Sequence, residues 1–274
     1  MSTVEGVRNA RWKIWRRRRS AVSPAMNLIG HLRELRKRLT YAIVAFLLIS
    51  IVAFFFYGPI LELIRRPLCA LDSRFLGPQG CDLIFTRVAG SFAFRLKITT
   101  LAGIFLSSPI WLYQAWAFIS PGLTVKEKKY SIPFVLASVT LFIAGGVVAY
   151  LTLPTGLRLL LTIGGDGLVA FLEADRYLSF VGLMTLGFGV MFELPIFLFF
   201  LGLVGVVSVK QLRKNRKIAV VVIAALSAVV TPSQDPFTLM ALAVPLYLMY
   251  EIAILALWRV DKRRAKRLAR SVER

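Results

Sequence analysis

The sequence predicts an all-α integral membrane protein, built as a bundle of six transmembrane helices in which the last two are short. Of its 274 residues, 57% are hydrophobic and the mean hydropathy is +0.70, which is too apolar for a soluble domain. Apolar runs of membrane-spanning length alternate with polar segments. Most basic residues fall in every second polar segment, an asymmetry typical of proteins oriented in a membrane.

The N-terminal segment divides into two parts. Residues 1–25 are polar and basic, include a run of arginines that ends at Arg19, and adjoin no apolar run. We therefore predict a disordered basic tail rather than a cleaved signal peptide. From Met26 onward, leucines recur at helical spacing, at Leu28, Leu32, Leu35 and Leu39. This pattern predicts an amphipathic helix on the membrane surface, and translation could begin at Met1 or at Met26.

The first predicted span runs from Thr40 to Tyr57. About 18 residues of helix, at about 1.5 Å each, just cross a hydrocarbon core of about 30 Å. Gly58 and Pro59 are expected to end this helix, because both residues disfavour a continuing helix. An outer loop of about 30 residues is predicted to follow, and it carries Pro67, Cys69 and Cys81.

The second predicted span runs from about Ser91 to Phe118. Pro109 lies inside it and is expected to kink the helix. Arg95 and Lys97 lie near its outer end, where long cationic side chains snorkel to the membrane interface.

The third and fourth predicted spans are joined by a second outer loop, residues 154–175. The third span, residues 131–153, contains small residues that permit close approach of another helix, namely Ala144, Gly145 and Gly146. The fourth span, residues 176–203, carries Glu193 near its middle and Pro195 just after it. A carboxylate at that depth is costly, so it predicts a specific role.

The last two predicted helices differ from the others in length. Residues 218–230 give only about 13 apolar residues, or about 20 Å of helix, against a core of about 30 Å. Either this helix extends into its polar flanks or the bilayer thins around it. Residues 237–258 form the sixth element, so the membrane domain is predicted to span residues 26–258. Residues 259–274 are predicted to be a basic cytoplasmic tail.

The positions of the basic residues predict the orientation of the bundle. About 27 of the 35 lysines and arginines lie before the first span, between the second and third, after the fourth and after the sixth. The alternate loops hold about six. This distribution predicts that both termini lie in the cytoplasm. We expect the protein to lie in the plasma membrane. The net charge of +21 is explained by contact with anionic lipid, so the bilayer rather than nucleic acid is the expected partner.

The chain lacks the residues that several classes of protein function require. The chain has two cysteines and one histidine, so metal sites, redox motifs and Cys/His nucleophile pairs are not expected. The motifs G-x-S-x-G, H-E-x-x-H and G-x-x-x-x-G-K-[ST] are absent from the sequence. We expect no enzyme activity and no cofactor, and any work that the protein does must draw on an energy source other than ATP.

Two acidic residues fall on ordered elements of the predicted cytoplasmic face. Glu34 lies in the amphipathic helix, and Glu127 lies among lysines in the polar segment 118–129. A carboxylate on a basic face invites a cationic ligand. The alternative is that both acids are solvated and neutralised by neighbours such as Arg38 or Lys128.

Four motifs occur together in this chain: HLRELRKRL at 31–39, YQAWAFISPGLTVKEKKY at 113–130, FGVMFELPI at 188–196 and TPSQDPFTLMALAVP at 231–245. Together they resemble the TatC family, the multi-spanning receptor subunit of the twin-arginine protein translocase. The resemblance covers about residues 27–258. It implies a glove-shaped bundle that binds twin-arginine signal peptides and recruits small single-span subunits of the TatA and TatB type. It also implies export of folded proteins driven by the proton-motive force, and we expect the chain to form a homo-oligomer within a receptor complex.

The resemblance also implies which residues bind the signal peptide. These are Glu34 and Arg36 in the amphipathic helix and, in the first cytoplasmic loop, Phe118, Pro121, Gly122, Leu123 and Glu127. The chemistry agrees, because a guanidinium group presents a planar donor fork that a carboxylate matches bidentately. Two carboxylates could therefore bind two consecutive arginines. If the protein's own lysines and arginines held both acids, this prediction would fail.

Glu193 supports two interpretations. One is a polar side chain that is hydrogen-bonded between helices, and the other is a charge or proton role in transport. The rival function is a proton-coupled secondary transporter that uses Glu193. The spans show no inverted repeat, and the motifs of the inner face have no evident task in such a transporter.

Three further sites remain as expectations. Glu251 is expected to pair with a basic residue of the C-terminal tail. Asp235, in an outer loop, resembles a family acid that usually follows two prolines directly, whereas Ser233 and Gln234 intervene here. Cys69 and Cys81 share an oxidising compartment, so they form either a disulfide or two free thiols.

Overall fold

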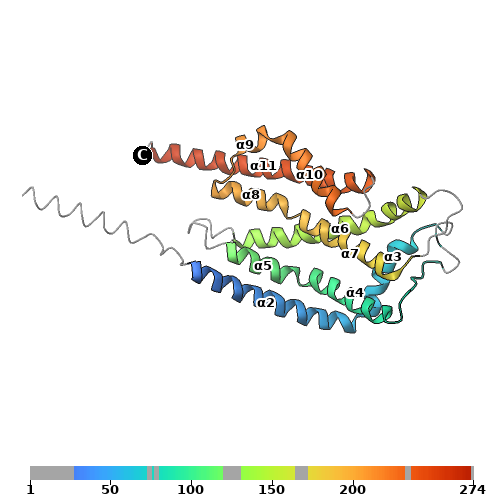
Figure 1. Cartoon of the computed structure of the whole chain (residues 1–274). Coiled ribbons are helices and arrows are strands. Elements are labelled where there is room, and N and C mark those ends of the chain that lie inside the picture. The colour runs from blue at the N-terminus through green and yellow to red at the C-terminus, as the bar shows by residue number, and fades with distance from the viewer. Residues whose placement is uncertain are drawn as a thin grey trace, which may run out of the picture.

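The computed structural model describes residues 28–72, 76, 80–119, 131–163, 172–231 and 236–272, which are mostly helical (Figure 1). Its helices in chain order are α2 (Leu28–Phe55), α3 (Tyr57–Cys69), α4 (Gly90–Leu106), α5 (Ser108–Ile119), α6 (Ser131–Ile163), α7 (Ala174–Met191), α8 (Leu194–Val204), α9 (Val209–Lys214), α10 (Arg216–Val230) and α11 (Pro236–Val272). Figure 1 shows the beginnings of α2 and α6 and the ends of α5 and α11 on the same side of the bundle.

Four helical segments of the described chain are long and apolar enough to cross a membrane: Ile29–Phe55, Ile132–Thr162, Ala174–Val204 and Pro236–Arg263. Helices α4 and α5 together make a fifth, bent by 51°. Helix α10 has 15 residues, about 22 Å, and is the short fifth element that the sequence predicts. The protein is therefore a multi-pass helical membrane protein.

Prolines account for two breaks within spans. Between α4 and α5 the break falls at Ser107, so Pro109 lies in the first turn of α5, where its missing N–H is tolerated. This confirms the predicted kink. Between α7 and α8 the break falls at Phe192 and Glu193, and Pro195 again lies in the first turn of the following helix.

Four elements differ from their predicted boundaries. Helix α2 is continuous, without a break between the predicted surface helix and the first span, and α6 continues to Ile163, into the predicted outer loop. Gly58 and Pro59 do not end helical structure, because the chain turns at Phe56 and continues as α3, with Pro59 in the first turn. The last helix is not short: α11 has 37 residues and continues through the predicted tail. Lysine, arginine and alanine are good helix formers, and cations near a C-terminus suit the helix dipole, so the basic segment extends α11.

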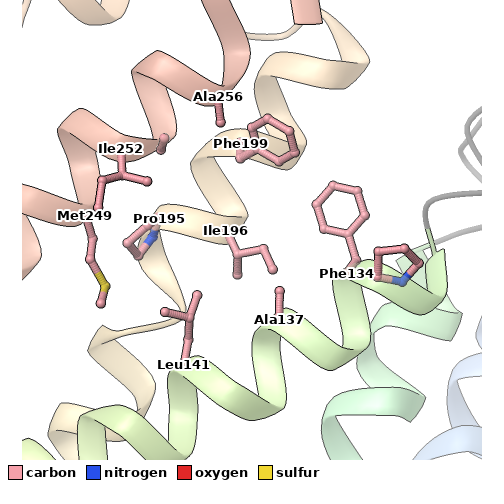
Figure 2. A pocket seen from close by; sticks show the side chains of 11 residues that line it. Phe134, Ala137, Leu141, Pro195, Ile196, Phe199, Met249, Ile252 and Ala256 are labelled. Carbon is pink, nitrogen blue, oxygen red and sulfur yellow. The ribbon is translucent and has the colours of Figure 1, made fainter. Parts of the chain in front are cut away.

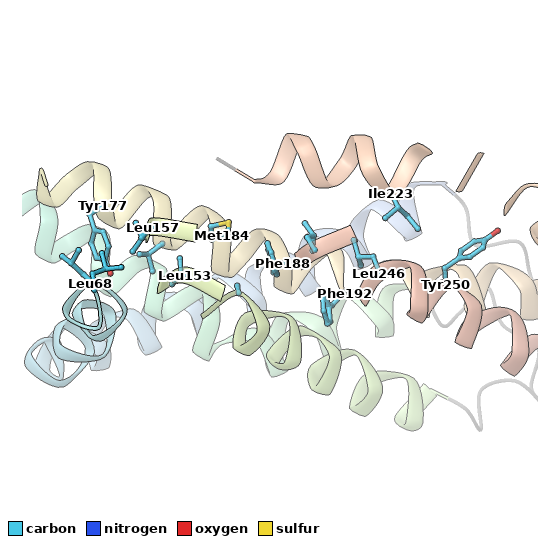
Figure 3. Close-up of a cluster of buried hydrophobic side chains, with 14 of the residues drawn as sticks. Leu68, Leu153, Leu157, Tyr177, Met184, Phe188, Phe192, Ile223, Leu246 and Tyr250 are labelled. Atoms are coloured by element: carbon cyan, nitrogen blue, oxygen red, sulfur yellow. The ribbon is translucent and has the colours of Figure 1, made fainter. Parts of the chain in front are cut away.

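The hydrophobic core lies where α6, α7 and α11 pack together (Figure 3). Four of its side chains are at most 2% exposed: Leu153, Phe188, Phe192 and Leu246. At Gly145 the backbones of α6 and α7 come so close that a Cβ atom would lie 2.6 Å from the carbonyl oxygen of Phe188. The small-residue patch of α6 therefore permits the close helix approach that the sequence predicts.

Candidate functional site

The site region begins where α2 and α5 meet, at one end of the bundle (Figure 1). His31, on the first turns of α2, stacks on Phe118, one residue before the end of α5. Their ring centroids lie 4.3 Å apart and the ring planes differ by 20°. This contact places the first turns of α2 beside the point where the chain leaves α5.

Glu34 lies one turn after His31 and is bound within its own helix. Arg38 donates to Glu34 Oε1 from Nη2 at 2.6 Å and from Nε at 3.0 Å. The two side chains are 24% and 25% exposed, so the pair is accessible to solvent. Such a pair between residues four apart stabilises a helix by about 0.3–0.5 kcal/mol, which an incoming guanidinium could displace. For Glu34, the structure therefore shows the alternative raised by the sequence, in which Arg38 neutralises its charge.

The other residues implied for this site are only partly described. Arg36 is exposed, and its carbonyl oxygen accepts a hydrogen bond from the Thr40 hydroxyl at 2.9 Å. Pro121, Gly122, Leu123 and Glu127 lie outside the described residues. Of the implied residues, Phe118 contacts α2 through His31, and Glu34 and Arg36 follow His31 within the next two turns of the same helix.

Glu193 lies at the break between α7 and α8 and bonds across helices. The Ser138 hydroxyl, on α6, donates to Glu193 Oε2 at 2.6 Å and itself accepts a hydrogen bond from the indole Nε1 of Trp116, on α5. Glu193 Oε1 is buried and has no hydrogen-bond partner among the described residues. This chain of bonds links three spans, as expected of a polar side chain that holds helices together.

The predicted pairing of Glu251 with a basic residue of the C-terminal tail is wrong. Its Oε2 accepts from Arg216 Nη2 at 2.6 Å, and Oε1 accepts from the Tyr247 hydroxyl at 3.2 Å. Arg216 begins α10, so the partner of Glu251 comes from the neighbouring helix rather than from the tail. Tyr250 adds a hydrogen bond to the carbonyl oxygen of Leu212, in α9, at 2.8 Å. These contacts fix α9 and α10 against α11.

The end of the bundle opposite His31 and Phe118 is cross-linked by a disulfide. Cys69 ends α3 rather than lying in a loop, and it forms a disulfide with Cys81, twelve residues later. Arg65 donates to the Asp82 carboxylate and to the Cys81 carbonyl oxygen. The segment after Cys81 then meets the start of α7 through a parallel bridge between Ile84 and Glu173. Together these contacts tie α3 to α7.

Pro67 also lies in α3, not in a loop, and it is buried. Its ring removes the N–H that would bond to the carbonyl oxygen four residues earlier, at Leu63. The Tyr150 hydroxyl, from α6, donates to that carbonyl oxygen at 2.9 Å, and the Tyr177 hydroxyl, from α7, donates to the next one, Ile64, at 2.7 Å. The proline therefore exposes an acceptor through which α3 is bound to α6.

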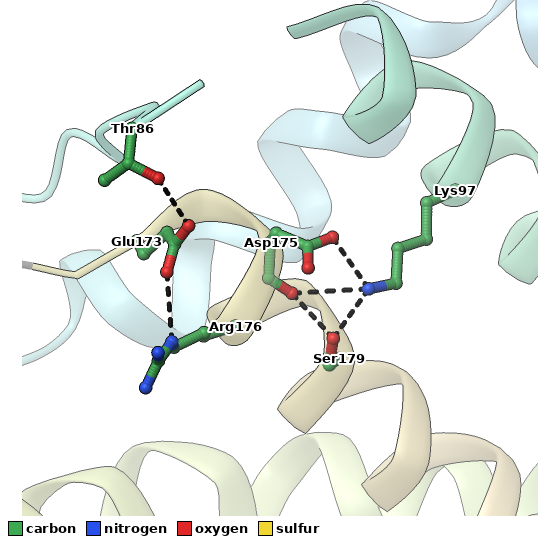
Figure 4. A network of polar contacts seen from close by, with 6 residues as sticks. All are labelled: Thr86, Lys97, Glu173, Asp175, Arg176 and Ser179. Carbon is green, nitrogen blue, oxygen red and sulfur yellow. Dashed lines mark hydrogen bonds and ion pairs between the residues drawn. The ribbon is translucent and has the colours of Figure 1, made fainter. Parts of the chain in front are cut away.

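A polar network joins α4 and the segment before it to the start of α7 (Figure 4). Lys97 Nζ donates to Asp175 Oδ1 at 2.7 Å and to the Ser179 hydroxyl at 2.6 Å. Glu173 accepts from the Thr86 hydroxyl at 2.7 Å and from Arg176 Nε at 3.0 Å. The Thr86 hydrogen bond, followed by the Arg176 contact, holds the pKa of the Glu173 carboxyl below its ordinary value. Asp235, another acid singled out from the sequence, lies outside the described residues.

Sequence reasoning missed several of these partners. Ser138 and Trp116 have no charge and lie in apolar spans, so nothing marks them as partners of Glu193. The aromatic partners of Arg95 were also missed: its guanidinium carbon lies 4.1 Å from the ring centroid of Phe54 and 4.9 Å from that of Tyr57. Aromatic residues around the junction of α2 and α3 were the available signal for this cation–π contact.

The chain is similar in sequence to known TatC proteins. The family model of the Sec-independent protein translocase protein TatC matches residues 30–245. A TatC protein of Frankia casuarinae is 45% identical over 259 residues, which is 92% of this chain and 71% of that protein. The TatC of Aquifex aeolicus is 36% identical, covering 84% of this chain and 93% of that protein. That of Corynebacterium kroppenstedtii is 35% identical, and this chain spans 63% of its length.

Solved structures show the same fold. A crystal structure of the twin arginine translocase receptor TatC in DDM has a TM-score of 0.70 and 36% sequence identity, and the match covers 82% of this chain and 98% of that one. A second crystal structure of this receptor has a TM-score of 0.69 and also 36% identity, covering 85% of this chain and 99% of that one.

Proposed function

The chain belongs to the TatC family of Sec-independent protein translocase proteins, and on this premise we propose that it is the core receptor subunit of a twin-arginine translocase. It binds the twin-arginine signal peptides of folded cargo and, with small single-span subunits, moves that cargo across the plasma membrane. Both termini lie in the cytoplasm in this proposal, as the distribution of basic residues predicts. The proton-motive force supplies the energy, without enzymatic turnover.

The contact between His31 and Phe118 is the observation that carries this proposal. It fixes the amphipathic start of α2, with Glu34 and Arg36, beside the origin of the segment that contains Glu127. Pro121, Gly122 and Leu123 shape that segment in the proposal. Two carboxylates held near one another bind two consecutive guanidinium groups, each through a planar fork of donors that a lysine lacks.

The ion pair between Glu34 and Arg38 must open before Glu34 can bind a signal peptide. The carboxylate must exchange an intrahelical partner for an arginine of the signal peptide. The exchange is feasible, because the internal pair contributes about 0.3–0.5 kcal/mol, whereas a hydrogen bond to a charged group contributes about 1.5–3 kcal/mol. Arg38 in this account keeps Glu34 neutralised while the site is empty.

Two charge-assisted contacts are not sufficient for tight binding. At the lower end of about 1.5–3 kcal/mol each, they fall short of the roughly 8 kcal/mol that micromolar affinity requires. The apolar stretch of the signal peptide must supply the remainder by contact with the bundle. The exposed apolar side chains of α2 are available for this role, among them Leu32, Leu35 and Leu39.

The partner subunits of the TatA and TatB type are proposed to dock on α10 and α11. Helix α10 exposes an apolar face that includes Val220, Val221 and Val229. Its 15 residues are too short to cross the hydrocarbon core, so a partner helix or a thinned bilayer must cover its end. Homo-oligomers of the receptor are proposed to assemble around these partners.

The proposed function is tested in cells from which the protein has been removed. We expect a folded reporter with a twin-arginine leader to stay in the cytoplasm, while uptake of small solutes and export of an unfolded reporter continue normally. Reintroducing the chain should restore export. If solute uptake failed and the folded reporter were exported normally, the alternative of a proton-coupled transporter that uses Glu193 would replace this proposal.

A further inference from the structure

An apolar groove of about 390 Å³ lies between α6, α8 and α11 (Figure 2). Its lining residues are non-polar and include Phe134, Ala137, Ile196, Phe199, Ile252 and Ala256. The three wall-forming helices belong to membrane-spanning segments, so the groove lies within the apolar part of the bundle. Its occupant must therefore be apolar over this length.

The face of α11 that lines the groove becomes basic one turn later. Arg259 and Arg263 follow Ile252 at intervals of seven and eleven residues, which places them on the same helical face as Ile252 and Ala256. Val260 packs against the aromatic cluster that includes Phe134, so this part of α11 stays beside the groove. Arg259 is three residues from Ala256, or about 4.5 Å along the helix axis.

A second concavity, of about 330 Å³, lies at this basic end and is lined by Trp258, Arg259, Lys262 and Arg263. The Lys262 ammonium lies 5.0 Å from the ring centroid of Trp258. None of the three cations forms an ion pair with any residue that the structure describes. Asp261, the nearest acid in sequence, lies about 200° around the helix from Arg259, on the opposite face.

From this arrangement we propose that the groove and the basic concavity form one binding site for an anionic phospholipid of the leaflet at which α11 ends. One acyl chain fills the apolar groove, and the phosphate group binds Arg259 and Arg263, whose planar forks match phosphate oxygens. Trp258 lies at the interfacial level, as tryptophans do in membrane proteins. Basic pockets between helices at the cytoplasmic surface suit anionic head groups, because each cation near the surface adds to the attraction.

The charge part of this proposal is tested by native mass spectrometry of the full-length purified protein. Phosphatidylglycerol and phosphatidylcholine with identical acyl chains are titrated in parallel. We expect the wild-type protein to prefer phosphatidylglycerol, and the Arg259→Gln/Arg263→Gln variant to bind it about tenfold or more weakly. The matched control is Arg213→Gln/Lys214→Gln, which removes the same charge from exposed positions of α9 and should bind as the wild type does.

The acyl-chain part is tested by filling the groove. Ala256→Phe should weaken binding of both phospholipids, whereas Ala225→Phe, the same change at an exposed position of α10, should not. If Ala256→Phe impairs folding, Ile252→Phe at the exposed rim replaces it. An unchanged lipid preference in the double arginine variant would overturn the proposal. So would a groove variant that binds lipid normally but loses a co-purifying single-span partner, since the groove would then hold a helix.

Discussion

Ser138 donates a hydrogen bond of 2.6 Å to Glu193 Oε2, and this bond joins α6 to the break between α7 and α8. It is one link in a chain that begins at Trp116 on α5. Because the bond joins two spans, it stabilises the packing of the helices in the bundle. The side chain of Glu193 therefore acts as a structural contact in this account.

The structural role of Glu193 predicts different results for two substitutions. Glu193→Gln keeps an acceptor for Ser138, so we expect normal assembly and near-normal export of a twin-arginine reporter. Glu193→Ala removes the acceptor and should destabilise the protein by about 1–3 kcal/mol, measured by thermal unfolding in detergent. Loss of export in a Glu193→Gln variant that assembles normally would instead demonstrate a charge or proton role.

The ion pair between Arg38 and Glu34 predicts that Arg38 competes with the signal peptide. We expect Arg38→Gln to tighten binding of a twin-arginine peptide about twofold, because the competing pair is worth about 0.3–0.5 kcal/mol. Lys37→Gln is the control, since Lys37 loses the same charge from the neighbouring position and points toward Tyr41. Binding is measured by fluorescence anisotropy of a labelled peptide. If Arg38→Gln weakened binding more than Lys37→Gln does, Arg38 would be part of the site.

The disulfide between Cys69 and Cys81 predicts that the stability of the protein depends on its redox state. The chain-entropy relation gives a stabilisation of about 3 kcal/mol for a loop of this length. Reduction, or the Cys69→Ser/Cys81→Ser variant, should lower the thermal midpoint and change mobility on a non-reducing gel. Equal mobility and equal midpoints with and without reductant would show that the protein in the membrane carries two free thiols.

Glu173 predicts an acid-sensitive contact between the loop before α4 and the start of α7. The Thr86 hydrogen bond and the Arg176 contact lower the pKa of Glu173 in the folded state. Its stabilisation is therefore fully present above the unfolded-state pKa of about 4.3, and is lost as the pH falls through the folded-state pKa. We expect the midpoint temperature of unfolding to decrease when the pH is lowered below about 4. In the Glu173→Gln variant this decrease should be smaller. A variant that shows the same pH dependence as the wild type would contradict this assignment.

Most of the bundle could be predicted from the sequence, because long apolar runs and the spacing of basic residues are properties of the local chain. Helix α3 could not, since Gly58 and Pro59 are ordinary helix terminators and only the turn at Phe56 places Pro59 in a new first turn. The role of Pro67 depends on the hydroxyl of Tyr150, which is far away in sequence. The continuation of α11 could not be predicted, because a run of cations after an apolar helix is equally typical of a solvated tail.

The candidate site was predictable in its composition but not in its contacts. Glu34 and Phe118 stand out from the motifs in which they lie, yet the stacking of Phe118 on His31 depends on how α2 and α5 pack. The partner of Glu251 lies 35 residues earlier, in α10, where the sequence offers many equivalent cations. Tertiary packing selects among candidates that local sequence cannot rank.

The most direct test of the account is photo-crosslinking of a twin-arginine peptide from a probe at Val125, with Glu127 intact. We predict a strong crosslink at the paired arginines in the wild-type protein and in His31→Phe, which keeps an aromatic ring against Phe118. Crosslinking should decrease about tenfold in Glu34→Ala, which removes one of the two carboxylates. It should also decrease in His31→Ala, which removes the ring that stacks on Phe118. Unchanged crosslinking in both Glu34→Ala and Glu127→Ala would contradict the claim that these carboxylates bind the two arginines.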